Sequence, residues 1–177
     1  METIIKIGIS SCLLGEDVRY DGGHKLDRFL VDTLGRFVEY VPVCPEVGCG
    51  LPVPREPMRL EGDPSSPRLV TVITHIDHTE RMLKWAAGRA AGLEEEGLCG
   101  YIFKSRSPSC GVEKVEVYIG AGAPVKAGAG MFARVLMERL PFLPVEEDDR
   151  LHDPDIRENF MERVSAYRNR RGTSRTG

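Results

Sequence analysis

Three short apolar runs, each followed by a cysteine, constrain the fold of this chain most. The runs span 4–9, 37–43 and 98–103, and Cys12, Cys44 and Cys110 follow them in that order. Short apolar runs bounded by turn residues are typical of buried strands. In an open parallel α/β sheet the carboxyl ends of the strands share one edge, where ligands bind. We therefore expect these three thiols, far apart in sequence, to converge at that edge.

Helical periodicity separates the runs. Apolar residues recur at intervals of three and four over 25–34 and over 82–93, and Asp77 with Glu80 marks the start of the second helix. Segments 58–62 and 68–74 can pair as a hairpin, 115–119 predicts a strand, and helices are expected over 131–139 and 153–169. The alternation predicts an α/β fold: a single compact domain with a mainly parallel sheet flanked by helices, a Rossmann-like three-layer arrangement.

Several segments do not predict regular structure. Residues 44–57 contain four prolines and two glycines, which argue against a helix or a central strand, so a long ordered loop is expected. Residues 120–130 form a linker rich in Gly and Ala, whose end at 128–130 is either an anion cradle or a simple turn. A last strand is expected at 142–145. The domain should span 1–169, and the polar, basic tail 170–177 should be disordered.

Composition excludes several classes of function. A chain of 177 residues corresponds to about one domain. The net charge of −3 gives no basic footprint for nucleic acid. No apolar run approaches the ~20 residues of a membrane span, and the N-terminus does not read as a signal peptide. We expect a cytoplasmic protein, a monomer or small homo-oligomer, whose partner is a small molecule.

The five cysteines point to metal binding or catalysis. Their number is odd, and a reducing cytosol makes structural disulfides improbable. No C-x-x-C pair is present, and no histidine is spaced from a cysteine as in a zinc finger. Cys99 lies within a strand and should behave as a small buried hydrophobe. Cys49, five residues after Cys44, remains a candidate reserve ligand or redox partner.

The loop after the third run concentrates hydroxyls beside a thiol. Residues 104–111 read Lys-Ser-Arg-Ser-Pro-Ser-Cys-Gly, and turn-forming residues can bring Ser105, Ser107, Ser109 and Cys110 into one small volume. The alternative is a helix cap provided by Ser107 or Ser109.

A carboxylate lies close to another of the thiols. Three thiolates on a cubane iron–sulfur cluster would leave one coordination position open, and Glu46, two residues after Cys44, would then be placed to act as a general base. Ser107, three residues before Cys110, would be placed to donate a proton. Alternatively, Glu46 caps a turn or pairs with Arg19 or Arg55, and Ser107 only caps.

Three motifs give the chain a family resemblance. Segments 11–15 (Ser-Cys-Leu-Leu-Gly) with 18–22, 42–47 (Pro-Val-Cys-Pro-Glu-Val) with 54–55, and 104–111 are similar, in order, to the thiouracil desulfidase (TudS-like) family. The resemblance implies an α/β domain with a [4Fe-4S] cluster on Cys12, Cys44 and Cys110. It also implies non-redox conversion of thiouracil to uracil and hydrosulfide, with Glu46 as base and Ser107 as proton donor. We further expect Asp21, His24 and Ser105 to contact the substrate.

Two questions stay open at this stage. The substrate is a thiobase or a thionucleoside, and the alternative function is a metal- or redox-sensing module, which needs ligands but no base. Segments 143–147 and 157–164 are similar to the junction in longer relatives that carry a second domain. Those relatives often have another residue at the position of Cys49, so the resemblance assigns this thiol no role.

Overall fold

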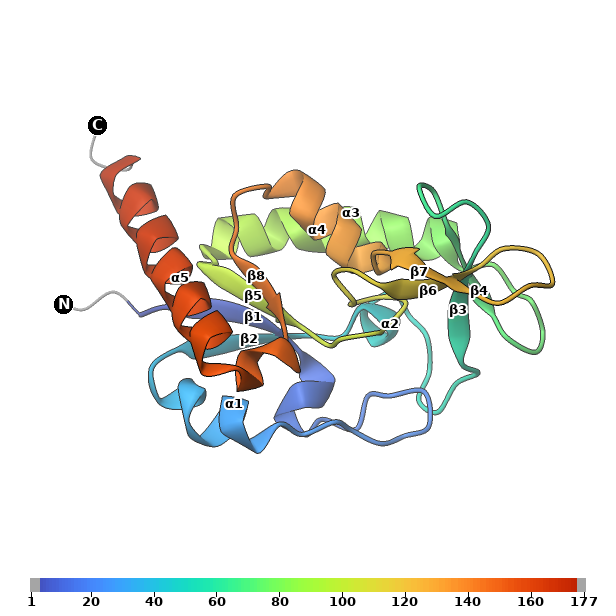
Figure 1. Ribbon diagram of the computed structural model, residues 1–177, viewed down its shortest axis with the longest axis horizontal. Coiled ribbons are helices and arrows are strands. Elements are labelled where there is room, and N and C mark those ends of the chain that lie inside the picture. The colour runs from blue at the N-terminus through green and yellow to red at the C-terminus, as the bar shows by residue number, and fades with distance from the viewer. Residues whose placement is uncertain (1–3, 175–177) are drawn as a thin grey trace.

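The parallel sheet is the centre of the molecule. The structure is a computed structural model that describes residues 4–174 (Figure 1). Its first sheet has the order β2-β1-β5-β8, and each neighbouring pair is parallel. These strands span Glu39–Val43, Lys6–Ser10, Gly100–Phe103 and Val145–Glu147. Parallel neighbours place the carboxyl ends of β1, β2 and β5 at one edge.

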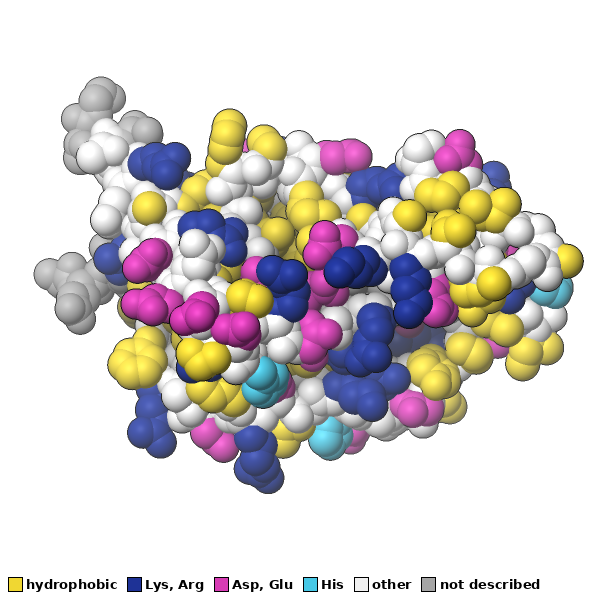
Figure 2. Space-filling view, in the orientation of Figure 1, with side chains coloured by type: hydrophobic (Ala, Val, Ile, Leu, Met, Phe, Trp, Pro, Cys, Tyr) yellow, Lys and Arg dark blue, Asp and Glu magenta, His cyan; other side chains and the backbone are white. Residues whose placement is uncertain are grey.

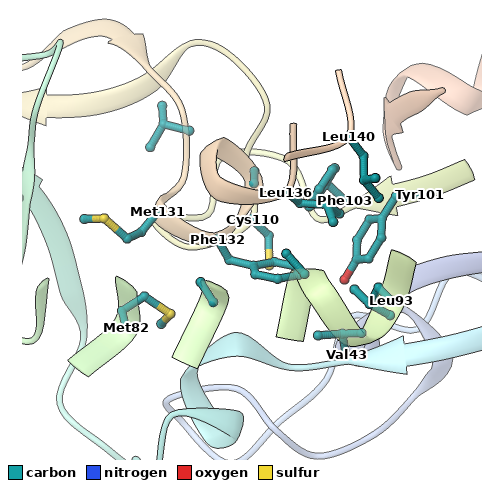
Figure 3. Close-up of a cluster of buried hydrophobic side chains, with 14 of the residues drawn as sticks. Val43, Met82, Leu93, Tyr101, Phe103, Cys110, Met131, Phe132, Leu136 and Leu140 are labelled. Atoms are coloured by element: carbon teal, nitrogen blue, oxygen red, sulfur yellow. The ribbon is translucent and has the colours of Figure 1, made fainter. Parts of the chain in front are cut away.

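Helices cover both faces of this sheet. Helices α3 (Thr79–Glu96) and α4 (Met131–Arg139) lie on one face, and α1 (Arg28–Asp32) and α5 (Pro154–Ser174) lie on the other (Figure 1). Successive side chains of a strand point to opposite faces. Accordingly Tyr101 and Phe103 join the core under α3 and α4, shown in Figure 3, whereas Ile102 joins the core under α1 and α5. The expected three-layer α/β domain is confirmed.

A second sheet extends this core. Its order is β4-β3-β6-β7, with strands Arg68–Thr71, Met58–Glu61, Val115–Tyr118 and Val125–Gly128. The β3–β4 hairpin is antiparallel as expected, β3 and β6 are parallel, and β6 and β7 are antiparallel. Leu60, Leu69 and Val117 are fully buried in the same core as Tyr101. One hydrophobic core therefore joins both sheets.

Two segments expected to be irregular contain regular structure. The linker 120–130 includes β7, because its backbone pairs with β6. The proline-rich segment begins with a one-turn helix, α2 (Pro45–Gly48). Proline is tolerated there because it occupies the first turn, where its missing N–H is not needed.

The other helices and strands differ from the expected ones mainly in where they begin and end. Helix α1 is shorter than the expected 25–34; Asp27 caps it by accepting a hydrogen bond from the Leu30 N–H (3.1 Å). Short 3₁₀ turns span Ser11–Leu14, Leu34–Arg36 and Arg150–His152. The last strand lies at β8 rather than at 142–145.

The C-terminal helix is longer than expected. It continues to Ser174, so residues 170–174 are helical rather than part of a disordered tail. Arg171 helps to hold this end, because its guanidinium donates to the carbonyls of Leu98 (3.0 Å) and Glu94 (3.2 Å). Residues 175–177 of the expected tail lie outside the described residues. No helix within 4–174 has the length and hydropathy that a bilayer span requires.

Candidate active site

A pocket of about 340 Å³ opens at the carboxyl edge of the parallel sheet. Cys12 lies in the 3₁₀ turn directly after β1, Cys44 directly follows β2, and Cys110 lies in the loop after β5. All three line this pocket. The structure therefore brings together the three thiols that the sequence placed beyond three separate strands.

The pocket lining is strongly basic. It includes the side chains of Arg19, Lys25, Arg55, Lys104 and Arg106, and Glu46 is the acidic residue among them. Figure 2 shows Lys and Arg side chains gathered around a hollow in the middle of the visible face. Positive charge around the thiols stabilises their ionised form, and it also favours the binding of an anionic group beside them.

Burial opposes ionisation of the same thiols. It raises the pKa of Cys12 to about 11, and the charges of Lys104 and Arg19 counteract only part of this shift. Burial also raises the pKa of Cys44 and of the more deeply buried Cys110. The thiols are therefore protonated at neutral pH in the metal-free protein, and a bound metal centre would have to displace their protons.

The loop that carries Cys110 is closed by Ser107. The hydroxyl oxygen of Ser107 accepts hydrogen bonds from the backbone N–H groups of Ser109 (3.2 Å) and Cys110 (3.1 Å). The helix cap that the sequence offered as an alternative is not formed, because residues 108–110 form a turn and no helix begins between β5 and β6; Ser107 stabilises this turn instead. Because Ser107 uses only its oxygen in these contacts, its hydroxyl hydrogen can still be donated.

Glu46 is held on both carboxylate oxygens. Its Oε2 accepts from Arg55 Nε (2.6 Å), and its Oε1 accepts from the Ser109 hydroxyl (2.9 Å). The side chains of Glu46 and Arg55 are only 15% and 6% exposed. The pairing with Arg55 that the sequence offered as an alternative is thus present, and it coexists with the position of Glu46 in the pocket wall. The contact with Ser109 was not foreseen, because it joins residues 63 positions apart.

The residues expected to contact substrate divide into two groups. Ser105 lines the pocket, where its hydroxyl oxygen accepts from Lys104 Nζ (3.0 Å). Asp21 and His24 are not among the lining residues. Asp21 accepts from the Gly23 N–H (2.9 Å), and His24 Nδ1 accepts from the Leu26 N–H (3.0 Å), both at exposed positions. The structure does not bring these two side chains to the thiols; Arg19, Tyr20 and Lys25 of the same loop line the pocket instead.

The two other cysteines lie outside the pocket lining. The Cys49 thiol donates to the Glu46 carbonyl (3.3 Å). Cys99 is buried in the core under α1 and α5, as expected, although it directly precedes β5 rather than lying within it. All five cysteines are free thiols. Within residues 4–174 no three His, Cys, Asp or Glu side chains are arranged to hold a single metal ion.

The fold and the pocket define a class of protein: an α/β domain with three thiols, a fixed carboxylate and a serine-rich loop at the carboxyl edge of its parallel sheet. A family model described as 2-thiouracil desulfurase matches residues 7–148, and the chain belongs to this family. The chain is also similar to the solved structure of a [4Fe-4S]-dependent thiouracil desulfidase, TudS, at 32% sequence identity and a TM-score of 0.69. The match covers 88% of this chain and 98% of that one. A comparison with curated proteins gave no match.

Proposed function

We propose that this protein removes sulfur from a thiopyrimidine, a thiobase such as thiouracil or its nucleoside, and releases the oxo-pyrimidine and hydrosulfide. The observation that carries the proposal is the convergence of Cys12, Cys44 and Cys110 on one pocket that also contains Glu46. Family membership and the similarity to TudS support the same reaction. Water replaces the sulfur on carbon, so no oxidation state changes. A cytoplasmic location would keep the thiols reduced.

The donor set fits a [4Fe-4S] cluster held by Cys12, Cys44 and Cys110. Thiolates are the ligands that iron–sulfur clusters ordinarily take. Cys12, Cys44 and Cys110 line one pocket, which suits a cluster held by three cysteines. A cluster held by three cysteines would have one iron without a protein ligand, which would supply a Lewis acid for the sulfur of the substrate.

Glu46 is the proposed general base. A carboxylate oxygen can accept two hydrogen bonds, and Arg55 and Ser109 contact different oxygens. A lone pair therefore remains to accept a proton from water that attacks the carbon bearing the sulfur. Ser107 is the proposed proton donor. Ser105, which also lines the pocket, is the proposed substrate contact.

The test is release of uracil and hydrosulfide from 2-thiouracil and 4-thiouracil by anaerobically reconstituted protein without a reductant. Glu46→Gln should lower kcat by about 10²–10⁴-fold, since positioned general bases contribute that much. Ser107→Ala should slow the reaction less, because water can replace its hydroxyl. Glu61→Gln is a matched control: Glu61 also accepts from an arginine Nε, that of Arg59 (2.8 Å), but it does not line the pocket. Absence of release from every thiopyrimidine and thionucleoside would favour the sensing module.

A further inference from the structure

We propose that Arg55 and Ser109 are positioning residues that hold the Glu46 carboxylate in one orientation relative to two of the thiols. This inference rests on the proposed function, in which Glu46 is the general base and its orientation therefore affects the reaction. Both residues line the pocket, but their hydrogen bonds are directed to Glu46 and to backbone carbonyls, so neither is expected to bind substrate. Their role follows from where their hydrogen-bond donors already point.

Nearly all donors of Arg55 are engaged. Nε and Nη2 both lie 2.6 Å from Glu46 Oε2. Nη2 also donates to the Val18 carbonyl (2.8 Å), and Nη1 donates to the Pro52 carbonyl (3.2 Å). The guanidinium is planar and rigid, so these contacts fix its plane and, through it, one oxygen of the carboxylate. Few of the hydrogen-bond donors of this buried guanidinium are therefore left to bind a ligand.

Ser109 fixes the other oxygen. Its side chain is 1% exposed, and its hydroxyl has a single hydrogen, which it donates to Glu46 Oε1. Ser109 precedes Cys110, and Glu46 follows Cys44 by two residues. The hydrogen bond therefore connects the two loops that carry these thiols, and the orientation of the carboxylate is coupled to both.

The contacts separate the two serines of this loop by role. Ser107 accepts two backbone hydrogen bonds and keeps its hydrogen, whereas Ser109 gives its hydrogen to Glu46. Substitution of Ser109 should therefore affect the reaction only through Glu46.

The experiment is a double-mutant cycle on the anaerobically reconstituted protein. Arg55→Gln, Arg55→Lys and Ser109→Ala are each made alone and together with Glu46→Gln. Iron content and the visible absorption spectrum are recorded before kcat and KM for 4-thiouracil. For the single variants we expect wild-type iron and KM. We expect kcat to fall about 10²-fold in Arg55→Gln, the size of the effect of a misplaced group. In Ser109→Ala, which loses one hydrogen bond to a charged group, the loss should be about tenfold. Arg55→Lys keeps the positive charge but lacks the planar guanidinium, so its kcat should lie between those of Arg55→Gln and the wild type.

In the Glu46→Gln background the same substitutions should cost no further activity, because residues that act only through Glu46 are not additive with its loss. Equal losses in both backgrounds would overturn the inference and place Arg55 or Ser109 on the substrate. Loss of iron in the single variants would overturn it as well, since the residues would then shape the metal site. A wild-type protein with full iron and no turnover would overturn the proposed function itself, and the positioning role with it.

Discussion

Replacing Gly130 by alanine tests how tightly the Cys110 loop is fixed. Gly130 is the N-cap of α4, and the first N–H groups of a helix have no partner within the helix. Here the cysteine loop supplies the partners: Met131 N donates to the Pro108 carbonyl (2.9 Å) and Phe132 N to the Ser109 carbonyl (3.0 Å). The Gly130 N–H itself donates to the Gly111 carbonyl (2.7 Å). The loop and the helix are thus one rigid unit.

A methyl group at this position has no space. A Cβ on Gly130 would lie 2.5 Å from the carbonyl carbon of Ser109 and 2.6 Å from the Cys110 nitrogen, where ordinary contacts begin at 3.4 Å. The loop would have to move by roughly 0.9 Å, whereas metal–ligand distances ordinarily vary by only about 0.2 Å. Overpacking of this kind costs about 1–3 kcal/mol. Gly130→Ala should therefore lose both stability and iron.

The assays are urea unfolding of the metal-free protein and iron content after anaerobic reconstitution. Gly88→Ala is the matched control, because a Cβ at Gly88 meets nothing within 4 Å. In the middle of α3, alanine should raise the free energy of unfolding by about 0.5–1 kcal/mol and leave the iron unchanged. Wild-type iron content together with wild-type stability in Gly130→Ala would refute the argument that this backbone contact fixes Cys110.

Two further predictions concern single side chains. Serine at Cys12, Cys44 or Cys110 should abolish iron retention. Cys99→Ser should keep its iron and lose roughly 1–3 kcal/mol of stability, because it buries a hydroxyl. The measurement is iron content per chain, and equal loss of iron in all four variants would show that the ligands are misassigned. The Tyr101 hydroxyl is the buried side-chain polar atom within 4–174 that has no hydrogen-bond partner. Tyr101→Phe should therefore leave the metal-free protein equally stable, or raise its free energy of unfolding in urea by about 1–3 kcal/mol. A clear loss of stability would reveal a partner for this hydroxyl.

The sequence determined the parallel sheet and the convergence of the thiols. Apolar runs and helical stripes encode local structure, and the βαβ alternation leaves few ways to order the strands. Once β1, β2 and β5 are parallel, Cys12, Cys44 and Cys110 must follow at one edge. The motifs around these cysteines also identified the family, because they preserve residue types at fixed short spacings.

Tertiary structure decided the rest, since it depends on contacts between distant segments. Strand β7 forms in a glycine-rich linker because β6 offers an unpaired edge, a condition that the linker's own residues do not reveal. Asp21 and His24 lie in the expected loop, but the turn that closes it directs their hydrogen bonds to neighbouring backbone. Glu46 could be selected from its distance to Cys44 in sequence. Its orientation comes from Arg55 and Ser109, which only the folded chain brings to its two oxygens.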